Sequence, residues 1–196
     1  NKCMTLPSSL QKSSEWVIVG PMGPELPKHL STFSSIAVDG GAHFIETHDV
    51  WVGDKDSLKK KSEAKIQFEH PTDKAISDLG LAFSLLTMPV KTIHLWGFLG
   101  GRQDHELFNL GEALHFLEKW SDAKILFYNN EGKPLFHLFG PGVYQLKHEG
   151  LFSLGAIKEI FFTLKGAVKY PVKTKTLLKP LSSFALSNMG QGDFEV

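Results

Sequence analysis

The sequence predicts an α/β domain with a mostly parallel, Rossmann-like sheet and helices on both faces, followed by a small antiparallel β-sandwich domain. Up to about residue 130, short apolar runs alternate with helical patterns, as in a parallel sheet covered by helices. Beyond that point the helical pattern fades, and short strand-like segments alternate with glycine-containing turns. We therefore expect two domains, at residues 14–130 and 131–196.

The predicted parallel sheet has six strands. Each segment is short, is rich in β-branched or aromatic residues, and is closed by Gly, Asp or Asn. The segments are Trp16–Val19, Ser35–Val38, Val50–Val52, Lys65–Phe68, Thr92–Trp96 and Lys124–Tyr128.

Two helices between these strands are marked by apolar residues at helical spacing. The first is predicted from about Ser77 to Thr87, with Ser77 as its N-cap. The second is predicted from about Asp104 to Trp120, with Asp104 as its N-cap or first-turn acid. The apolar stripes are Leu79, Phe83 and Leu86 on the first helix, and Leu107, Leu110, Leu114 and Leu117 on the second.

The second domain is predicted from its turns. Turn signals recur at regular spacing, as Gly140-Pro141-Gly142, Glu149-Gly150, Lys165-Gly166 and Met189-Gly190. The strands predicted around them are Leu135–Phe139, Val143–Leu146, Leu151–Leu154, Glu159–Leu164 and Ala185–Ser187.

Composition excludes several classes of protein. Lys plus Arg and Asp plus Glu number 21 each, and no basic stripe is present, so we expect no nucleic-acid partner. No apolar run is long enough to cross a bilayer, so we expect no membrane association. The single cysteine, Cys3, cannot form an internal disulfide, which favours a reducing compartment and a cytoplasmic protein.

The first polar cluster is Asp39-Gly40-Gly41, which directly follows a predicted strand. Ligands of open α/β sheets bind at the carboxyl ends of strands. Glycines at that place allow backbone N–H groups to approach a phosphate closely. The structural alternative is a tight turn with a solvated Asp39.

The second cluster is Gly53-Asp54-Lys55-Asp56-Ser57, also just past a strand. Asp54 and Asp56 are two residues apart, so their carboxylates can point the same way. Magnesium usually takes one or two protein carboxylates together with substrate phosphate oxygens. The structural alternative is a charged turn in which Asp56 or Ser57 caps a helix.

The third cluster runs from Thr72 to Asp78. Asp78 is predicted in the first turn of a helix, where the helix dipole stabilises an acid. It either has that capping role alone or adds a third carboxylate to the same cleft as the first two clusters.

The fourth cluster runs from Gly97 to His105, with Asn109 one helical turn later. Gly100 and Gly101 can bend the backbone around a phosphate at a helix N-terminus. Arg102 offers a bidentate fork for phosphate oxygens. Asp104 either joins a metal site or holds Arg102.

All four clusters fall at the carboxyl ends of predicted parallel strands, on one edge of one sheet. Acids, one arginine and glycines at a common edge predict a magnesium–polyphosphate site. The nine histidines form no metal-binding pattern in the sequence. For each of them a surface or core role is expected.

The order and spacing of these motifs resemble the thiamine pyrophosphokinase family. The resemblance is strongest over residues 16–110. It extends into the β-rich part through Gly166–Pro171 and Leu186–Asn188.

The resemblance implies an enzyme that uses Mg²⁺ and ATP to make thiamine diphosphate and AMP from thiamine. It also implies a homodimer, with thiamine between the α/β domain of one subunit and the sandwich of the other. The implied catalytic residues are Asp54, Asp56, Asp78 and Arg102, with Asp54, Asp56 and Asp78 as metal ligands. The implied substrate-binding residues are Asp39, Gly40, Gly41, Gly101, Asp104, His105 and Asn109, with Ser187 and Asn188 on the thiamine side.

The third motif departs from the family pattern at two positions. Ala75 stands where the family usually has Asp, and Ser77 stands where it has Thr. Ser77 keeps the hydroxyl, but Ala75 removes a carboxylate. Asp73 is the nearby acid able to supply that charge, from a position two residues away. A binding protein without turnover, the same chemistry on another acceptor, and an aspartyl-phosphate phosphatase are the alternatives.

Overall fold

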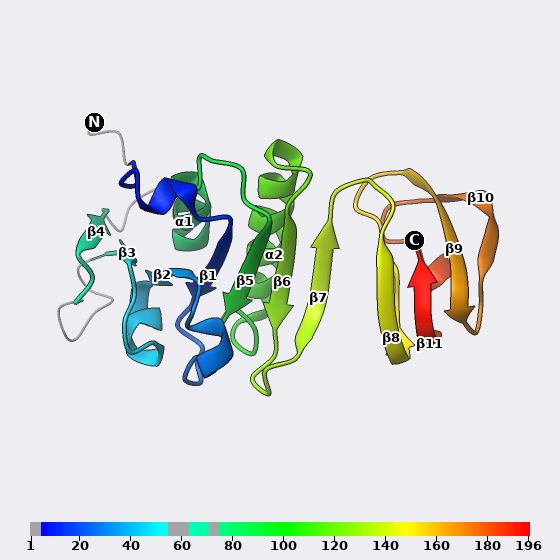
Figure 1. Cartoon of the computed structure of the whole chain (residues 1–196), viewed down its shortest axis with the longest axis horizontal. Helices are drawn as coiled ribbons and strands as arrows, with labels where there is room; N and C mark the ends of the chain where they lie inside the picture. Colours follow the sequence, from blue (N-terminus) through cyan, green and yellow to red (C-terminus); the bar gives the residue numbers. More distant parts are fainter. Residues whose placement is uncertain (1–4, 55–62, 71–74) are drawn as a thin grey trace. The chain divides into compact units, whose positions relative to one another are not determined.

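The structure is a computed structural model that describes residues 5–54, 63–70 and 75–196. The chain divides into two compact units, Asn1–Gly140 and Pro141–Val196 (Figure 1). The division falls after Gly140 and not near residue 130. The reason is that strand β7 (Pro134–Phe139), which we assigned to the second domain, pairs with the last parallel strand of the first.

The first unit contains a seven-stranded sheet with the order β4-β3-β2-β1-β5-β6-β7 (Figure 1). Strands β1 to β6 pair in parallel, and only β7 is antiparallel to its neighbour. The mostly parallel sheet and all six predicted strands are therefore confirmed. Their bounds are β1 Glu15–Val19, β2 Ser34–Val38, β3 Val50–Gly53, β4 Ile66–Glu69, β5 Thr92–Trp96 and β6 Lys124–Tyr128.

The strand order reverses between β1 and β5, which are neighbours although three strands separate them in the chain. Successive strands from β1 to β4 are added on one side of β1, and those from β5 onward on the other. Such a reversal leaves a crevice outside the carboxyl ends of the two strands, where open α/β sheets bind ligands.

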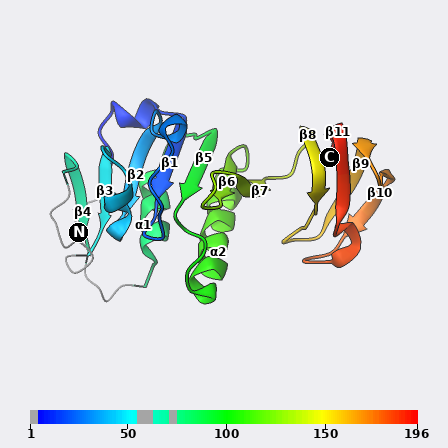
Figure 2. The same cartoon turned by 90° about the horizontal axis from the view of Figure 1, so that it is seen from below.

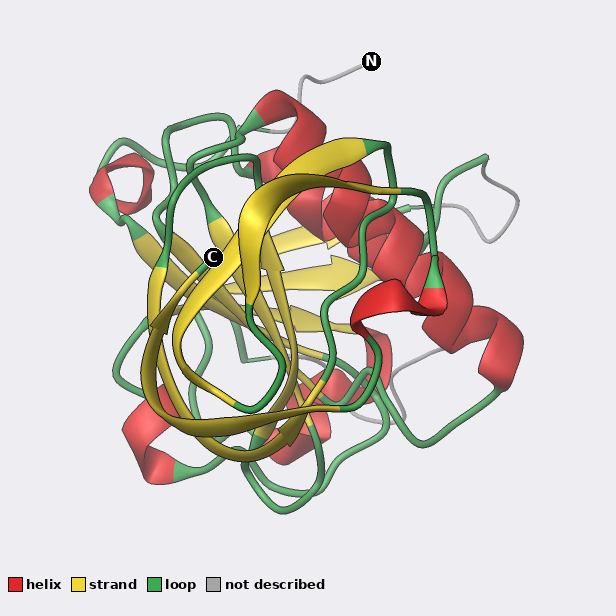
Figure 3. Ribbon diagram, turned by 90° about the vertical axis from the view of Figure 1, so that its right-hand side faces the viewer, coloured by secondary structure: helices red, strands yellow, loops and turns green. Residues whose placement is uncertain are grey.

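Two α-helices pack on one face of this sheet. They are α1 (Asp78–Leu85) and α2 (Gln103–Lys119), and the rings of Phe83 and Phe116 stack between them at 5.0 Å. Both helices join the core that contains Trp16 and Ile18 of β1. Figure 3 shows α2 as a long red helix.

The opposite face of the sheet is covered differently from the prediction. Because successive side chains of a strand point to opposite faces, Val17 and Val19 of β1 belong to a second core. The segments that pack there include the short 3-10 helix η2 (Lys28–Leu30) and the end of η3 (Asp39–Phe44). Within the described residues, both α-helices therefore lie on one face. A further 3-10 helix, η1, spans Leu10–Lys12.

The apolar stripes of the two helices have different outcomes. Leu79, Phe83 and Leu86 are buried as predicted. On α2, however, Ala113, Phe116 and Leu117 are buried, whereas Leu107 is 65% exposed. The leucine spacing correctly indicated a helix, and Leu110 and Leu117 contact the core, but the face that packs on the sheet is rotated away from Leu107.

The second unit is a four-stranded antiparallel sheet with the order β10-β9-β11-β8. The strands appear in yellow to red in Figure 2. The antiparallel pairing is confirmed, but the described strands form one sheet where a sandwich was expected. Register shifts interrupt the pairing of β9 with both neighbours. The bounds are β8 Gln145–Phe152, β9 Ile160–Val168, β10 Val172–Leu178 and β11 Asn188–Glu195.

Three predicted turns of this unit were wrong, because their glycines lie inside strands. Gly150 and Gly166 have φ of 111° and 106°, which disfavour other residues. A Cβ at Gly166 would lie 2.8 Å from the carbonyl oxygen of Asp193, and one at Gly190 would collide with that of His148. Glycine inside a strand marks such close backbone approach. Strand β10 was missed. Ala185–Ser187 is not a strand, because Ala185 is the last residue of the 3-10 helix η4 (Ser183–Ala185).

None of the helices in the described ranges combines the length and the apolar character needed to cross a bilayer.

A buried hydrogen-bonded histidine links three strands of the first sheet. His94 of β5 is 6% exposed. Its Nδ1 lies 2.7 Å from the hydroxyl of Tyr128 on β6, and its Nε2 lies 2.9 Å from Oε1 of Glu15 on β1. The ring of Phe33 stacks on the imidazole at 4.7 Å. Burial, followed by the negative charge of Glu15, raises the pKa of Tyr128 above its ordinary value.

We expect Tyr128→Phe to lower the free energy of unfolding by about 1–3 kcal/mol, because it leaves a buried imidazole nitrogen without its partner. Urea denaturation measures the change. Combining the substitution with His94→Leu should cost less than the sum of the two single changes, because the same hydrogen bond is lost in both. Additive costs would contradict this assignment.

Candidate functional site

Asp39 is held at the end of β2 in an unusual backbone conformation. Its φ is 49°, a left-handed value that Asp tolerates better than most residues. The indole Nε1 of Trp51 donates a hydrogen bond to the Asp39 carbonyl oxygen at 3.1 Å. Strand β3 therefore fixes the backbone from which the Asp39 carboxylate projects.

Gly53, at the end of β3, makes room for that carboxylate. A Cβ at position 53 would lie 2.6 Å from Oδ1 of Asp39. No real Cβ atom tolerates such a contact without a shift of its neighbour. Gly53, in the second motif, therefore leaves the space that the carboxylate of Asp39, in the first motif, occupies.

Asp78 and His70 meet beside this position. Ser77 caps helix α1 as predicted, because its Oγ accepts a hydrogen bond from the Gly80 N–H at 3.0 Å. Asp78 follows in the first turn. His70 comes directly after β4, and its backbone N–H donates to the carbonyl oxygen of Gly53 at 3.2 Å. Its Nε2 lies 2.6 Å from Oδ1 of Asp78.

Asp39, His70 and Asp78 form a group that is able to hold a metal ion. One ligand atom from each residue lies within 4.8 Å of the others. Two carboxylates and one imidazole are ligands that divalent cations accept in proteins. His70 was missed in the sequence, where we expected no histidine to belong to a metal pattern. The signal was its place after a parallel strand, a criterion that we applied to acids, glycines and one arginine but not to histidines.

The structure brings together only part of the predicted acid set. Among the described residues, the group does not include Asp54, which follows β3 and is half-buried. Asp56 and Asp73 lie outside the described residues. Asp39, which we assigned to the nucleotide, is instead grouped with Asp78.

The loops after β1 and β5 are hydrogen-bonded to each other at the point where the strand order reverses. The N–H of Gly20 donates to Trp96 O at 2.7 Å, and that of Met22 donates to Gly97 O at 3.0 Å. Gly97 has φ of 78°, and a Cβ there would lie 2.5 Å from Gly20 O. Sequence reasoning missed the loop from Gly20 to Gly23, although it also follows an apolar strand.

The predicted phosphate-binding glycines lie around this crevice. A Cβ at Gly41 would collide with the carbonyl oxygen of Val19, whereas one at Gly40 would meet no atom closer than 3.7 Å. A Cβ at Gly101 would lie 2.9 Å from the Met22 sulfur. The loops after β1, β2 and β5 therefore approach each other at this edge.

Arg102 and Asp104 pair with each other at the start of α2. The guanidinium donates to Asp104 through Nε at 3.1 Å and through Nη2 at 2.6 Å. This hydrogen bond to Arg102 lowers the pKa of Asp104, and the same bond raises the pKa of Arg102. Of the two roles left open for Asp104, the structure contains the one that holds Arg102.

Three further residues of this motif differ in their surroundings. His105 is exposed, and its N–H donates to Oδ1 of Asp104 at 3.0 Å. Asn109 approaches the carbonyl oxygen of Phe98 only at 3.5 Å. Glu106, which we did not predict, accepts the Gly100 N–H at 2.5 Å. The N–H of Gly100, in the loop where we expected a phosphate, therefore already donates to a carboxylate of the same chain.

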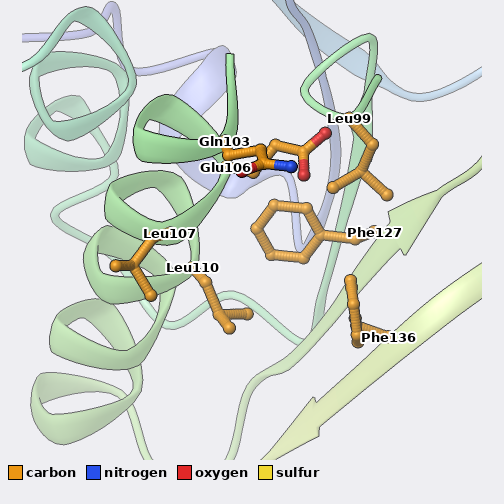
Figure 4. Close-up of a pocket in the computed structure, with 7 residues that line it drawn as sticks. All are labelled: Leu99, Gln103, Glu106, Leu107, Leu110, Phe127 and Phe136. Carbon is orange, nitrogen blue, oxygen red and sulfur yellow. The ribbon is translucent and has the colours of Figure 1, made fainter. Parts of the chain in front are cut away.

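An apolar pocket of about 250 Å³ lies beside the same helix (Figure 4). It shares no residue with the group of Asp39, His70 and Asp78, and five of its seven lining residues are apolar, so it is poorly suited to a polyphosphate. We place the chemistry at the polar group instead. The lining residues are Leu99, Gln103, Glu106, Leu107, Leu110, Phe127 and Phe136.

In the second unit, Asn188 is buried and holds the backbone of Tyr170. Its Nδ2 donates to Tyr170 O at 2.8 Å, and its Oδ1 accepts the Tyr170 N–H at 3.1 Å. Ser187 is exposed, with φ of 60°. A pocket of about 200 Å³ includes Tyr170, Phe184 and Asn188 in its lining. Asn188 therefore positions this pocket.

The fold and the site define an open α/β protein with a candidate ligand site at the carboxyl ends of its strands. The sequence model described as the catalytic domain of thiamin pyrophosphokinase matches residues 29–127. The chain belongs to the thiamin pyrophosphokinase family. A search of curated proteins returned no match.

Solved structures share this fold over nearly the whole chain. Thiamine pyrophosphokinase from Bacillus subtilis is 21% identical, with a TM-score of 0.68 and 92% of both chains covered. A family protein from Enterococcus faecalis is 17% identical, with a TM-score of 0.68 and 93% of both chains covered. The yeast enzyme is 13% identical, with a TM-score of 0.61, covering 98% of this chain and 86% of that one.

We expect Gly53→Ala to destabilise the protein by about 1–3 kcal/mol, because the new methyl group overpacks against Asp39 and Trp51. Gly111→Ala is the matched control. Its Cβ would meet nothing within 4 Å on α2, and alanine should stabilise that helix by about 0.5–1 kcal/mol. Denaturant unfolding measures both, and equal effects would refute the role of Gly53.

We expect Arg102→Gln to raise the pKa of Asp104, because the hydrogen bond that lowers it is removed. NMR titration of the Asp104 carboxyl carbon measures the shift. Since the folded-state pKa is depressed, any stability from the pair is present above the ordinary Asp pKa and is lost as the pH falls through the folded value. An unchanged titration would show that the pair does not persist in solution.

Proposed function

We propose that this chain transfers a pyrophosphoryl group from ATP to the hydroxyl of thiamine, giving thiamine diphosphate and AMP. This is the activity of the family to which it belongs. The observation that carries the proposal is the convergence of Asp39, His70 and Asp78 at one edge of a parallel sheet. Such a group can hold the cation that accompanies a polyphosphate.

In this proposal the thiamine hydroxyl oxygen attacks the β-phosphorus of ATP. The new bond joins that oxygen to the β-phosphorus, and the bridge to the α-phosphate breaks to release AMP. Bound Mg²⁺ would neutralise charge on the phosphate oxygens. Asp39 and Asp78 of this group are the carboxylates proposed to hold it, together with Asp54 and Asp56, which the family resemblance implies as ligands. Asp78 either serves in this way or accepts the hydroxyl proton.

The glycine loops and Arg102 are proposed to position the phosphates. Gly40 leaves the backbone open to a close ligand, and Gly41 and Gly101 are proposed to act by letting the neighbouring loops approach each other. Arg102 has to exchange Asp104 for phosphate oxygens. Its side chain is 72% exposed, and a solvent-exposed ion pair contributes little stability. Breaking the pair with Asp104 therefore costs little free energy. His105 and Asn109 are proposed to complete the nucleotide side from α2.

The second unit is proposed to bind thiamine. Tyr170 and Phe184 line its pocket, and aromatic faces attract a cationic ring such as that of thiamine. Asn188 would act by fixing the Tyr170 backbone, and Ser187 would contact the ligand from the exposed turn. A homodimer and a cytoplasmic location follow from the family resemblance and the composition, and both stay predictions.

The direct test is a product assay with purified protein, ATP, Mg²⁺ and thiamine. We expect AMP and thiamine diphosphate in equal amounts. Asp78→Asn should lower turnover by on the order of 100-fold or more, because a charged group that acts on the phosphates is lost. His115→Gln, on the exposed side of α2, is the control and should retain full activity.

Two results of this assay would favour the alternatives. Thermal stabilisation by thiamine or ATP without AMP release would indicate a binding protein. AMP release with another acceptor, but not with thiamine, would support the nucleotide site and show that thiamine is not the acceptor. Full turnover in Asp78→Asn would refute the assignment of the site.

A further inference from the structure

We propose that His70 is a nitrogen ligand of the divalent cation at the strand ends, and that it shifts the site from Mg²⁺ toward Mn²⁺ and Co²⁺. The geometry that points to this is the group formed by Asp39, His70 and Asp78. The inference deepens the proposed function and rests on it for the identity of the site, but cation binding is measured without substrate.

The imidazole is fixed in place before any ion arrives. The backbone of His70 is tied to the end of β3 by the hydrogen bond from its N–H to Gly53 O at 3.2 Å. Its side chain is only 8% exposed. A ligand that is already ordered loses little conformational entropy when it binds a cation.

The three ligand atoms are close to the spacing that one cation requires. Metal–ligand bonds of about 2.0–2.2 Å place ligand atoms roughly 3–4.3 Å apart around one ion. The group lies within 4.8 Å, and Nε2 of His70 is 2.6 Å from Oδ1 of Asp78. Small side-chain shifts therefore open the group around an ion, with no change in the strands.

The nitrogen donor decides which cations are favoured. Mg²⁺ prefers oxygen ligands and retains its waters, whereas imidazole suits first-row transition metals. Ala75, close to this position in the sequence, offers no side-chain ligand atom. In the described residues, His70 is the third donor of the group, beside Asp39 and Asp78.

The competing explanation is that His70 only orients Asp78 through a hydrogen bond. In that case its loss should weaken every cation alike, because the shared carboxylate becomes less ordered. A direct nitrogen ligand predicts a loss that depends on the metal. The two explanations are therefore separable by comparing cations.

The experiment compares wild type with His70→Gln, His70→Asp and the control His115→Gln, on the whole chain without ATP or thiamine. Calorimetric titration gives the affinities for Mn²⁺, Co²⁺ and Mg²⁺. Pulsed EPR of the Mn²⁺ complex detects coupling to a ligand nitrogen. Circular dichroism checks that each variant is folded.

In wild type and His115→Gln we expect nitrogen coupling and tighter binding of Mn²⁺ than of Mg²⁺. His70→Gln should lose the coupling and about 10–100-fold in Mn²⁺ and Co²⁺ affinity, with a much smaller loss for Mg²⁺. His70→Asp should lose the coupling but bind Mg²⁺ more tightly than wild type, because an oxygen ligand replaces nitrogen.

The absence of nitrogen coupling in wild type would overturn the proposal, as would equal losses for all three cations in His70→Gln. If either histidine-70 variant does not fold, the wild-type coupling and the other variant still decide the matter. A protein that binds Mn²⁺ through His70 but makes no thiamine diphosphate would refute the proposed function and leave this inference standing.

Discussion

Parallel pairing of the first six strands is the constraint on which the site depends. It sends their carboxyl ends to a single edge, so residues far apart in the chain meet there. The hydrogen bonds between the loops after β1 and β5 fix the centre of this edge. Asp39 follows β2, His70 follows β4 and Asp78 begins α1, and none of them alone would form a site.

Glycine allows these strand ends to approach so closely. Gly97 and Gly20 bring two backbones together at distances that exclude a Cβ, and Gly53 gives its space to the Asp39 carboxylate. The same residue type has another role in the second unit, where Gly166 and Gly190 let strands of the sheet approach each other. Glycine allows close backbone contact in both units, but only the glycines of the first unit lie at the candidate ligand site.

Charged groups at the start of α2 are satisfied within the chain. Arg102 pairs with Asp104, and Glu106 accepts the Gly100 amide. Both contacts are exposed, so water competes with them and they are readily exchanged. In the proposed reaction a phosphate group would replace these carboxylates, so the polar groups of the loop would be satisfied both before and after it binds.

The outcomes for the strands and helices show which signals were reliable. Buried parallel strands, such as Trp16–Val19, are continuous apolar runs, and a run of that kind is readable without knowledge of its neighbours. Ser77 was readable as a cap because its hydrogen bond to Gly80 is local. Turns at Gly150 and Gly166 were predicted wrongly, because a glycine in a bent strand and a glycine in a turn have the same sequence signature.

By itself, the sequence determined the parallel sheet, the two helices and the polar motifs at the strand ends, because these depend on local composition and spacing. Only the tertiary structure decided that β7 joins the first sheet, that Leu107 is exposed, and that His70 meets Asp78. Each of these depends on contacts between segments distant in the chain. Such contacts are set by strand order and packing, which the spacing of residues along the chain does not encode.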